Sequence, residues 1–137
     1  MRIALAQVNP LVGDVTGNVE LIRRTAGEAS DGGADLVVFP EMVITGYPPL
    51  DLLERPELSA RSLDALEQLA PLTRDGPALI VGHPAPNPAS RGKPFVNAAT
   101  LLASGSIRES YAKRLLPSYD VFDEDRWFEP GPAPGIM

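Results

Sequence analysis

Short apolar runs alternate along this chain with segments whose apolar residues recur at helical spacing, and this alternation constrains the possible folds most strongly. Helical spacing marks residues 17–31 and 58–74. Strand-like runs occupy residues 2–8, 35–39, 77–83, 95–103 and 107–113. Strands that alternate with helices favour an α/β layer architecture. We therefore expect helices on one face of a sheet and a further layer on the other face.

The ends of the predicted elements carry local signals. Thr16 or Asn18 is the expected N-cap of the first helix, and the DGG that follows position 30 ends it. Ser59 lies near the start of the second helix. The SGS at 104–106 predicts a hairpin between the last two strands. The run 2–8 is interpreted as a buried strand.

Composition excludes several classes of protein. The 137 residues carry 12 basic and 18 acidic side chains, a net charge of −6, so the basic surface that binds nucleic acid is not expected. The chain has no cysteine and a single histidine, which excludes a disulfide framework, a Cys/His zinc site and a cysteine nucleophile among these residues. Proline is frequent, at 15 of 137 residues, and clusters in GYPPLD, GHPAPNPASRGKP and EPGPAPG, which we interpret as loops of one compact domain. The N-terminus is too short and polar for a signal or membrane segment, so a cytoplasmic location is expected.

Glu41 stands between two apolar stretches, VVFP and MVIT, which is an unfavourable place for a charge. A buried carboxylate needs a partner or a shifted pKa. Lys113, one of only two lysines, ends the last predicted strand as Glu41 follows the second. α/β sheets collect functional side chains at strand ends, but spacing alone leaves open whether these two meet.

Three stretches carry a resemblance to a known family. They are MRIALAQVNPLVGDVTGN, VVFPEMVITGYPPLDLL and YAKRLLPSYDVFDEDRWFEPG. Together they resemble consecutive blocks of the glutamine-hydrolysing domain of bacterial glutamine-dependent NAD synthetases, which belongs to the nitrilase, or carbon-nitrogen hydrolase, superfamily. The resemblance runs from residue 1 to about residue 131 and implies an α-β-β-α sandwich, of which residues 1–137 would be the N-terminal part.

The resemblance also implies a site built from a glutamate, a lysine and a cysteine. Matched by motif, these roles fall on Glu41 as general base and Lys113 as oxyanion stabiliser, and a tyrosine that contacts glutamine falls on Tyr119. Tyr47 is a further candidate at the pocket entrance. This motif match predicts that Glu41 and Lys113 lie within about 6 Å of each other. The family's cysteine lies on a strand beyond the last motif, where Ile136 and Met137 would begin that strand.

The function that this resemblance implies is hydrolysis of L-glutamine to supply ammonia for ATP-dependent amidation of nicotinic acid adenine dinucleotide to NAD. No cofactor is expected in this chain, and ATP and magnesium are expected only in a synthetase domain of the same polypeptide. A homo-oligomer is expected, with no nucleic-acid or membrane partner. Two alternatives stay open: an inert nitrilase-fold fragment that acts at most in binding or oligomerisation, and another nitrilase-type amidase.

Each candidate residue also has a plain structural interpretation. Glu41 would be a solvated turn residue and Lys113 a surface cation at a hairpin end. Tyr119 would pack its ring in the core, and Tyr47 would pack within a turn. His83, before a proline at a strand end, is interpreted as structural.

The acidic run around residues 120–124 does not follow the D-x-D-x-D-G calcium pattern. VGDVTGN lacks the spacing of a phosphate-binding loop. Neither stretch is therefore predicted to hold a ligand.

Overall fold

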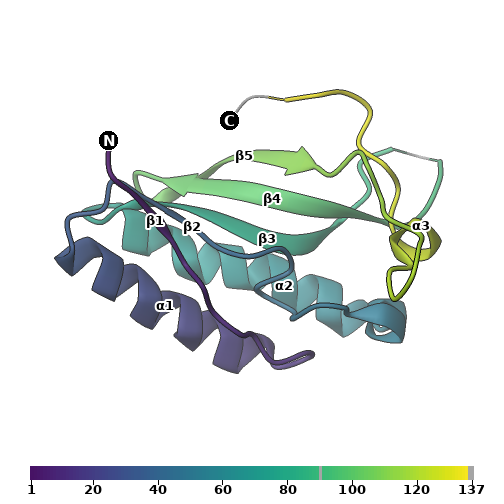
Figure 1. The fold of residues 1–137 in the computed structure, drawn as a ribbon, viewed down its shortest axis with the longest axis horizontal. Helices are drawn as coiled ribbons and strands as arrows, with labels where there is room; N and C mark the ends of the chain where they lie inside the picture. The colour runs from purple at the N-terminus through teal and green to yellow at the C-terminus, as the bar shows by residue number, and fades with distance from the viewer. Residues whose placement is uncertain (90, 136–137) are drawn as a thin grey trace.

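The computed structural model describes residues 1–89 and 91–135. One five-stranded sheet runs through it in the order β1-β2-β3-β4-β5 (Figure 1). The strands are β1 (Ile3–Leu5), β2 (Leu36–Val38), β3 (Ala78–Pro86), β4 (Phe95–Ala103) and β5 (Ser106–Ala112). The first three strands are parallel, and β4 and β5 are added antiparallel. This mixed sheet with its helices confirms the predicted α/β class.

The two long helices lie on the same face of the sheet (Figure 1). They are α1 (Val15–Asp31) and α2 (Pro56–Leu69), and the shorter elements are α3 (Glu124–Trp127) and the 3₁₀ helices η1 (Leu50–Glu54) and η2 (Ala70–Thr73). Fully buried side chains from both long helices, Ile22 and Leu69 among them, meet Val37, Leu79 and Leu102 from the sheet. This helix layer and the facing side of the sheet form the core.

The opposite face of the sheet is apolar and only partly buried. Alternate residues of the central strands, Val38, Ile80 and Leu101, retain intermediate exposure. Ile3 and Leu5 of β1 are 48% and 75% exposed. Because side chains alternate across a strand, these residues share the face that the two helices do not cover. The expectation that the sheet needs a further layer there agrees with this exposure.

The prediction of a buried strand at residues 2–8 is wrong. The strand covers only Ile3–Leu5 and lies at the edge of the sheet beside β2. An edge strand has one neighbour, so its outward side chains are covered only if another element reaches them.

The predicted N-cap of the first helix is also wrong. Asp14 caps α1, and its side chain accepts a hydrogen bond from the Gly17 amide at 2.9 Å. Asn18 is instead buried inside the helix, where it donates to the carbonyl oxygens of Leu11 and Ile44 at 2.8 and 3.0 Å. Asn18 therefore ties the loop before α1 to the turn after β2.

Two further points bear on the sequence predictions. Residues 136 and 137, where the next strand was expected to begin, lie outside the described residues. Across residues 1–89 and 91–135, no helix combines the length and the apolar character that crossing a membrane requires.

His83 is buried in a chain of hydrogen bonds between α2 and β5. Its Nδ1 lies 3.1 Å from the Pro84 carbonyl oxygen, which can only accept, so Nδ1 carries the proton. Nε2 then accepts from the Thr100 hydroxyl at 2.8 Å, and Thr100 in turn contacts the Ser110 hydroxyl at 2.8 Å. Burial lowers the pKa of His83 to about 4, although the Pro84 carbonyl opposes the change.

This burial predicts an acid-sensitive fold. Below the ordinary histidine pKa of about 6.5 the unfolded chain binds a proton that the folded chain does not, so the free energy of unfolding should fall as the pH drops from about 6.5 to about 4. Deuterium exchange at the imidazole C2 of His83, followed by mass spectrometry, should give a midpoint near 4 in the folded protein. The same residue in a short peptide is the control. A folded-state midpoint close to the peptide's value would contradict the buried neutral histidine.

Candidate active site

Glu41 lies on a turn that its apolar neighbours anchor. The chain leaves β2 at Val38, and the next three residues after Glu41, Met42 to Ile44, are fully buried. Met42 adopts a left-handed φ of 54°, a conformation that non-glycine residues rarely hold and that is concentrated at functional sites. The turn therefore buries its apolar side chains while the Glu41 side chain stays 42% exposed.

Gly82 of β3 allows this turn to lie directly against the sheet. A Cβ atom at position 82 would stand 2.6 Å from the Pro40 oxygen and 2.6 Å from the Met42 nitrogen. The neighbours are backbone atoms, which cannot move aside as a flexible side chain can. Glycine is thus required here for close approach, and the Glu41 backbone is held by that contact.

Lys113 follows β5 and reaches Glu41 from the other side. Its backbone amide donates to the Asn97 carbonyl at 2.8 Å, which extends the pairing of β4 with β5. Its ammonium lies 3.0 Å from Oε1 of Glu41. The predicted proximity of these two residues is confirmed, while their catalytic roles stay predictions.

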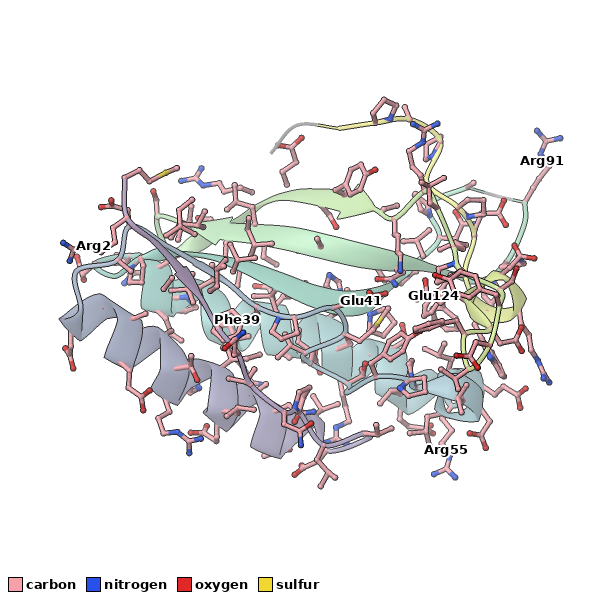
Figure 2. The ribbon with its side chains drawn as sticks, viewed as in Figure 1. Arg2, Phe39, Glu41, Arg55, Arg91 and Glu124 are labelled. Atoms are coloured by element: carbon pink, nitrogen blue, oxygen red, sulfur yellow. The ribbon has the colours of Figure 1, made fainter. Side chains whose placement is uncertain are left out.

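A second glutamate, which sequence reasoning did not identify, completes the cluster. Glu124 begins α3 and is only 4% exposed, and its two carboxylate oxygens lie 3.0 and 2.9 Å from the Lys113 ammonium. The Tyr47 hydroxyl donates to the same carboxylate at 3.0 Å. Figure 2 shows Glu41 and Glu124 at one end of the sheet, with Arg2 at the other. In the sequence, Glu124 stands among Asp123 and Asp125 with nothing to distinguish it.

Asn97 of β4 is the other residue that the prediction missed. Its side chain is 4% exposed, and Nδ2 donates to Oε1 of Glu41 and lies 3.4 Å from Oε2 of Glu124. A signal was present in the sequence, because Asn97 is a lone amide in the apolar run FVNAATLLA. A polar residue within a buried strand needs a partner, and here the partners are the two carboxylates.

The charges in this cluster stabilise one another. Burial raises the pKa of Glu41, but hydrogen bonds from Lys113 and Asn97 outweigh it and leave the pKa below its usual value. Burial lowers the pKa of Lys113, but Glu124 and Glu41 outweigh it and leave the pKa raised. Burial and the neighbouring Glu124 raise the pKa of Tyr47, which keeps its hydroxyl a donor. Glu41 is therefore held ionised beside a charged lysine.

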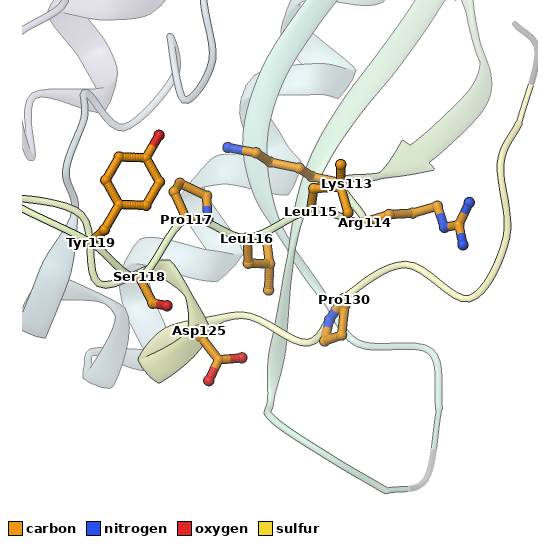
Figure 3. Close-up of a pocket in the computed structure, with 9 residues that line it drawn as sticks. All are labelled: Lys113, Arg114, Leu115, Leu116, Pro117, Ser118, Tyr119, Asp125 and Pro130. Carbon is orange, nitrogen blue, oxygen red and sulfur yellow. The ribbon is translucent and has the colours of Figure 1, made fainter.

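Glu41 and Lys113 line a hollow of about 290 Å³ on the open face of the sheet, together with Asn97, Tyr111 and Ile80. The 42% exposure of the Glu41 side chain shows that this hollow is partly open. A larger groove of about 630 Å³ lies along residues 113–119 (Figure 3). Of the charged cluster, that groove contains only Lys113, so the hollow is the better candidate for the chemistry.

The two predicted tyrosines are placed differently. Tyr47 joins the cluster through Glu124, whereas Tyr119 lies in the larger groove and is 69% exposed. The interpretation of Tyr119 as a core residue is wrong. Phe122 connects the two rings, at 6.3 Å from Tyr47 and 5.6 Å from Tyr119 between centroids. Contact of either tyrosine with a substrate stays a prediction.

A glutamate and a lysine lie paired at the strand ends of an α/β sheet, in an open hollow, where one group can move protons and the other can stabilise negative charge. The model of the carbon-nitrogen hydrolase family matches residues 2–135. The chain belongs to that family.

Within the family, the chain is similar to glutamine-dependent NAD(+) synthetases. The chain is 44% identical over 133 residues to the one from Xylella fastidiosa and 41% identical over 129 residues to the one from Synechocystis sp.. These matches cover 96% and 92% of this chain. They cover only 24% and 23% of the relatives, so the chain spans about a quarter of their length.

Solved structures give the same result. The match to glutamine-dependent NAD+ synthetase from Acinetobacter baumannii has a TM-score of 0.84 and 36% identity, and it covers 94% of this chain and 24% of the synthetase chain. The match to an amidase from Nesterenkonia sp. has a TM-score of 0.81 and 31% identity, and it covers 98% of this chain and 49% of the amidase chain. In a mutant of that amidase, acrylamide has undergone Michael addition at the active-site cysteine.

No site for a metal emerges from the described part of the chain. Residues 1–89 and 91–135 contain no group of three or more His, Cys, Asp or Glu side chains arranged to hold an ion.

Proposed function

We propose that this chain is the part of a glutamine amidohydrolase that carries its general base and its oxyanion-stabilising cation. Glu41 is the base and Lys113 is the cation. The observation that carries the proposal is the Lys113 ammonium, 3.0 Å from an ionised Glu41 in an open hollow of a carbon-nitrogen hydrolase.

The chemistry assigns each group a step. Glu41 removes the proton from a thiol, and the thiolate attacks the side-chain carbonyl carbon of glutamine. Lys113 stabilises the oxyanion that forms as the carbonyl double bond opens. Glu41 then returns the proton to the departing nitrogen, which leaves as ammonia, and water hydrolyses the thioester to glutamate. The thiol belongs to a residue beyond these 137, since the chain contains no cysteine.

The remaining cluster residues support these two groups. Glu124 and Tyr47 form the buried side of the cluster, where the Glu124 carboxylate holds the Lys113 ammonium by contacts of 3.0 and 2.9 Å. A lysine held on two sides loses little freedom when a substrate arrives, which favours stabilisation of the oxyanion.

The ammonia has a defined use in this proposal. A synthetase domain of the same polypeptide, with ATP and magnesium, amidates nicotinic acid adenine dinucleotide to NAD. Support comes from the NAD(+) synthetases that the chain resembles at up to 44% identity over 133 residues. Tyr119, exposed in the groove beside Lys113, is the proposed contact for the glutamine substrate.

A second candidate function is that of a stand-alone amidase, which the match to the Nesterenkonia protein favours. Glutamine and acrylamide tested side by side on the full-length polypeptide distinguish the two. Release of ammonia from glutamine, coupled to NAD formation, supports the synthetase; hydrolysis of acrylamide without NAD formation supports the amidase.

The two lysines of the chain provide a matched test of the Lys113 assignment. In the full-length polypeptide, Lys113→Met should lower kcat for glutamine by about 10²–10³-fold, the usual loss when an oxyanion donor is removed. Lys93→Met is the control, because Lys93 pairs with Asp125 at 2.9 Å outside the cluster. Ammonia release in a coupled assay measures both. Equal effects of the two changes would contradict the role given to Lys113.

A further inference from the structure

The side chain of Asn97 connects the two carboxylates of the cluster directly. One nitrogen, Nδ2, donates to Oε1 of Glu41 and lies 3.4 Å from Oε2 of Glu124. An amide nitrogen has two hydrogens, one for each carboxylate. Both partners are acceptors, so the nitrogen and not the amide oxygen must face them.

Asn97 also determines which oxygen of Glu41 is left available. Oε1 accepts from both Lys113 and Asn97, whereas within the described residues no hydrogen bond reaches Oε2. The side chain is 42% exposed and lines the hollow, so one oxygen of this carboxylate is held and the other accepts no hydrogen bond from residues 1–89 and 91–135.

A neutral donor suits this position for an electrostatic reason. The cluster holds two carboxylates and one ammonium, and a second cation at position 97 would compete with Lys113 for both carboxylates. A carboxylate at that position would repel them. An amide stabilises the ionised form of Glu41 without displacing Lys113.

We propose that Asn97 is a positioning residue, which holds Glu41 and Glu124 in one arrangement around Lys113 and leaves Oε2 of Glu41 free to move protons. The proton-transfer part rests on the proposed function above. The contacts belong to a rigid part of the fold, because β4 pairs with both β3 and β5 around Asn97.

The test compares Asn97→Asp and Asn97→Ala with wild type in the full-length polypeptide. Asn97→Asp keeps the shape of the side chain and removes its donors, so both variants should lower kcat for glutamine by about 10- to 100-fold, with KM little changed. Loss of the donor raises the pKa of Glu41, so the acid limb of the kcat profile should move up by about one pH unit in Asn97→Ala, and further in Asn97→Asp, where the added carboxylate also repels Glu41. Besides Asn97, the groups facing Glu41 are Lys113, Glu124, Tyr47 and Tyr111.

Thr100→Val is the matched control on the same strand. Thr100 is 1% exposed and bonds to His83 and Ser110, not to the cluster. This variant should leave the acid limb unmoved, whatever it does to stability. Circular dichroism reports whether each variant is folded, and ammonia-dependent NAD formation normalises each rate to the amount of active synthetase.

Two results would overturn the proposal. Wild-type kcat and an unmoved acid limb in Asn97→Asp would show that only the volume of the side chain matters. A lower kcat with an unmoved acid limb would indicate a structural lesion alone.

If wild type releases no ammonia from glutamine, the proposed function fails. The Asn97 contact can still be tested by a carbon-13 NMR titration of the Glu41 carboxylate, whose signal is assigned by its absence in Glu41→Gln. Its midpoint should be higher in Asn97→Ala, which removes the donor without adding a charge, and an equal midpoint would refute the positioning role.

Discussion

Replacing Glu41 by glutamine in the full-length polypeptide is expected to lower glutamine-dependent NAD formation by about 10²–10⁴-fold, the contribution typical of a general base. The amide has nearly the shape of the carboxylate but cannot accept the thiol proton. NAD formation from added ammonia should stay near the wild-type rate, because that reaction bypasses the glutamine site. Steady-state rates with each nitrogen source measure both effects.

Glu28→Gln is the control for this change. Glu28 lies on α1, its side chain is 71% exposed, and its nearest cation, Arg24, is 4.0 Å away. The control should keep both activities. If Glu41→Gln lost glutamine-dependent and ammonia-dependent synthesis equally, the carboxylate would be a structural element and the proposed base would be wrong.

The 137-residue chain by itself is expected to release no ammonia from glutamine. A thiolate attack needs a cysteine, and the sequence has none. Ser118 is the hydroxyl closest in sequence to Lys113 on its C-terminal side, but it is exposed in the segment between β5 and α3 rather than on a strand in the hollow. An assay of ammonia release from the purified chain measures this directly, and turnover above the buffer rate would refute the mechanism.

The same chain is also expected to associate. The sheet face opposite α1 and α2 exposes Ile3 and Leu5 at 48% and 75%, and β5 carries Ile107 at 40%. Exposed apolar faces and unpaired strand edges promote association. Leu5→Lys should reduce light scattering, whereas Leu115→Lys, at an 86% exposed site outside the sheet, should not. A monodisperse monomer would contradict this interpretation of the open face.

Local patterns in the sequence determined the order of the elements. The β4 prediction at residues 95–103 matches the strand Phe95–Ala103, and the hairpin turn lies where SGS predicts it. Periodicity and turn residues act over a few positions, so a single sequence displays them. The pairing of Glu41 with Lys113 was also predicted, from motifs that the family match supports.

Only the tertiary structure decided which polar residues join the site. Asn97 and Glu124 are 27 positions apart, and Tyr47 and Glu124 are 77 apart, so no local pattern relates them. Tertiary contacts also drew Asn18 away from the cap that its residue type favours, and left Leu5 on an edge rather than in the core. Burial and hydrogen-bond partners depend on segments that meet through the folded sheet, and a buried carboxylate is favourable only where those segments bring a lysine, a tyrosine and an amide to it.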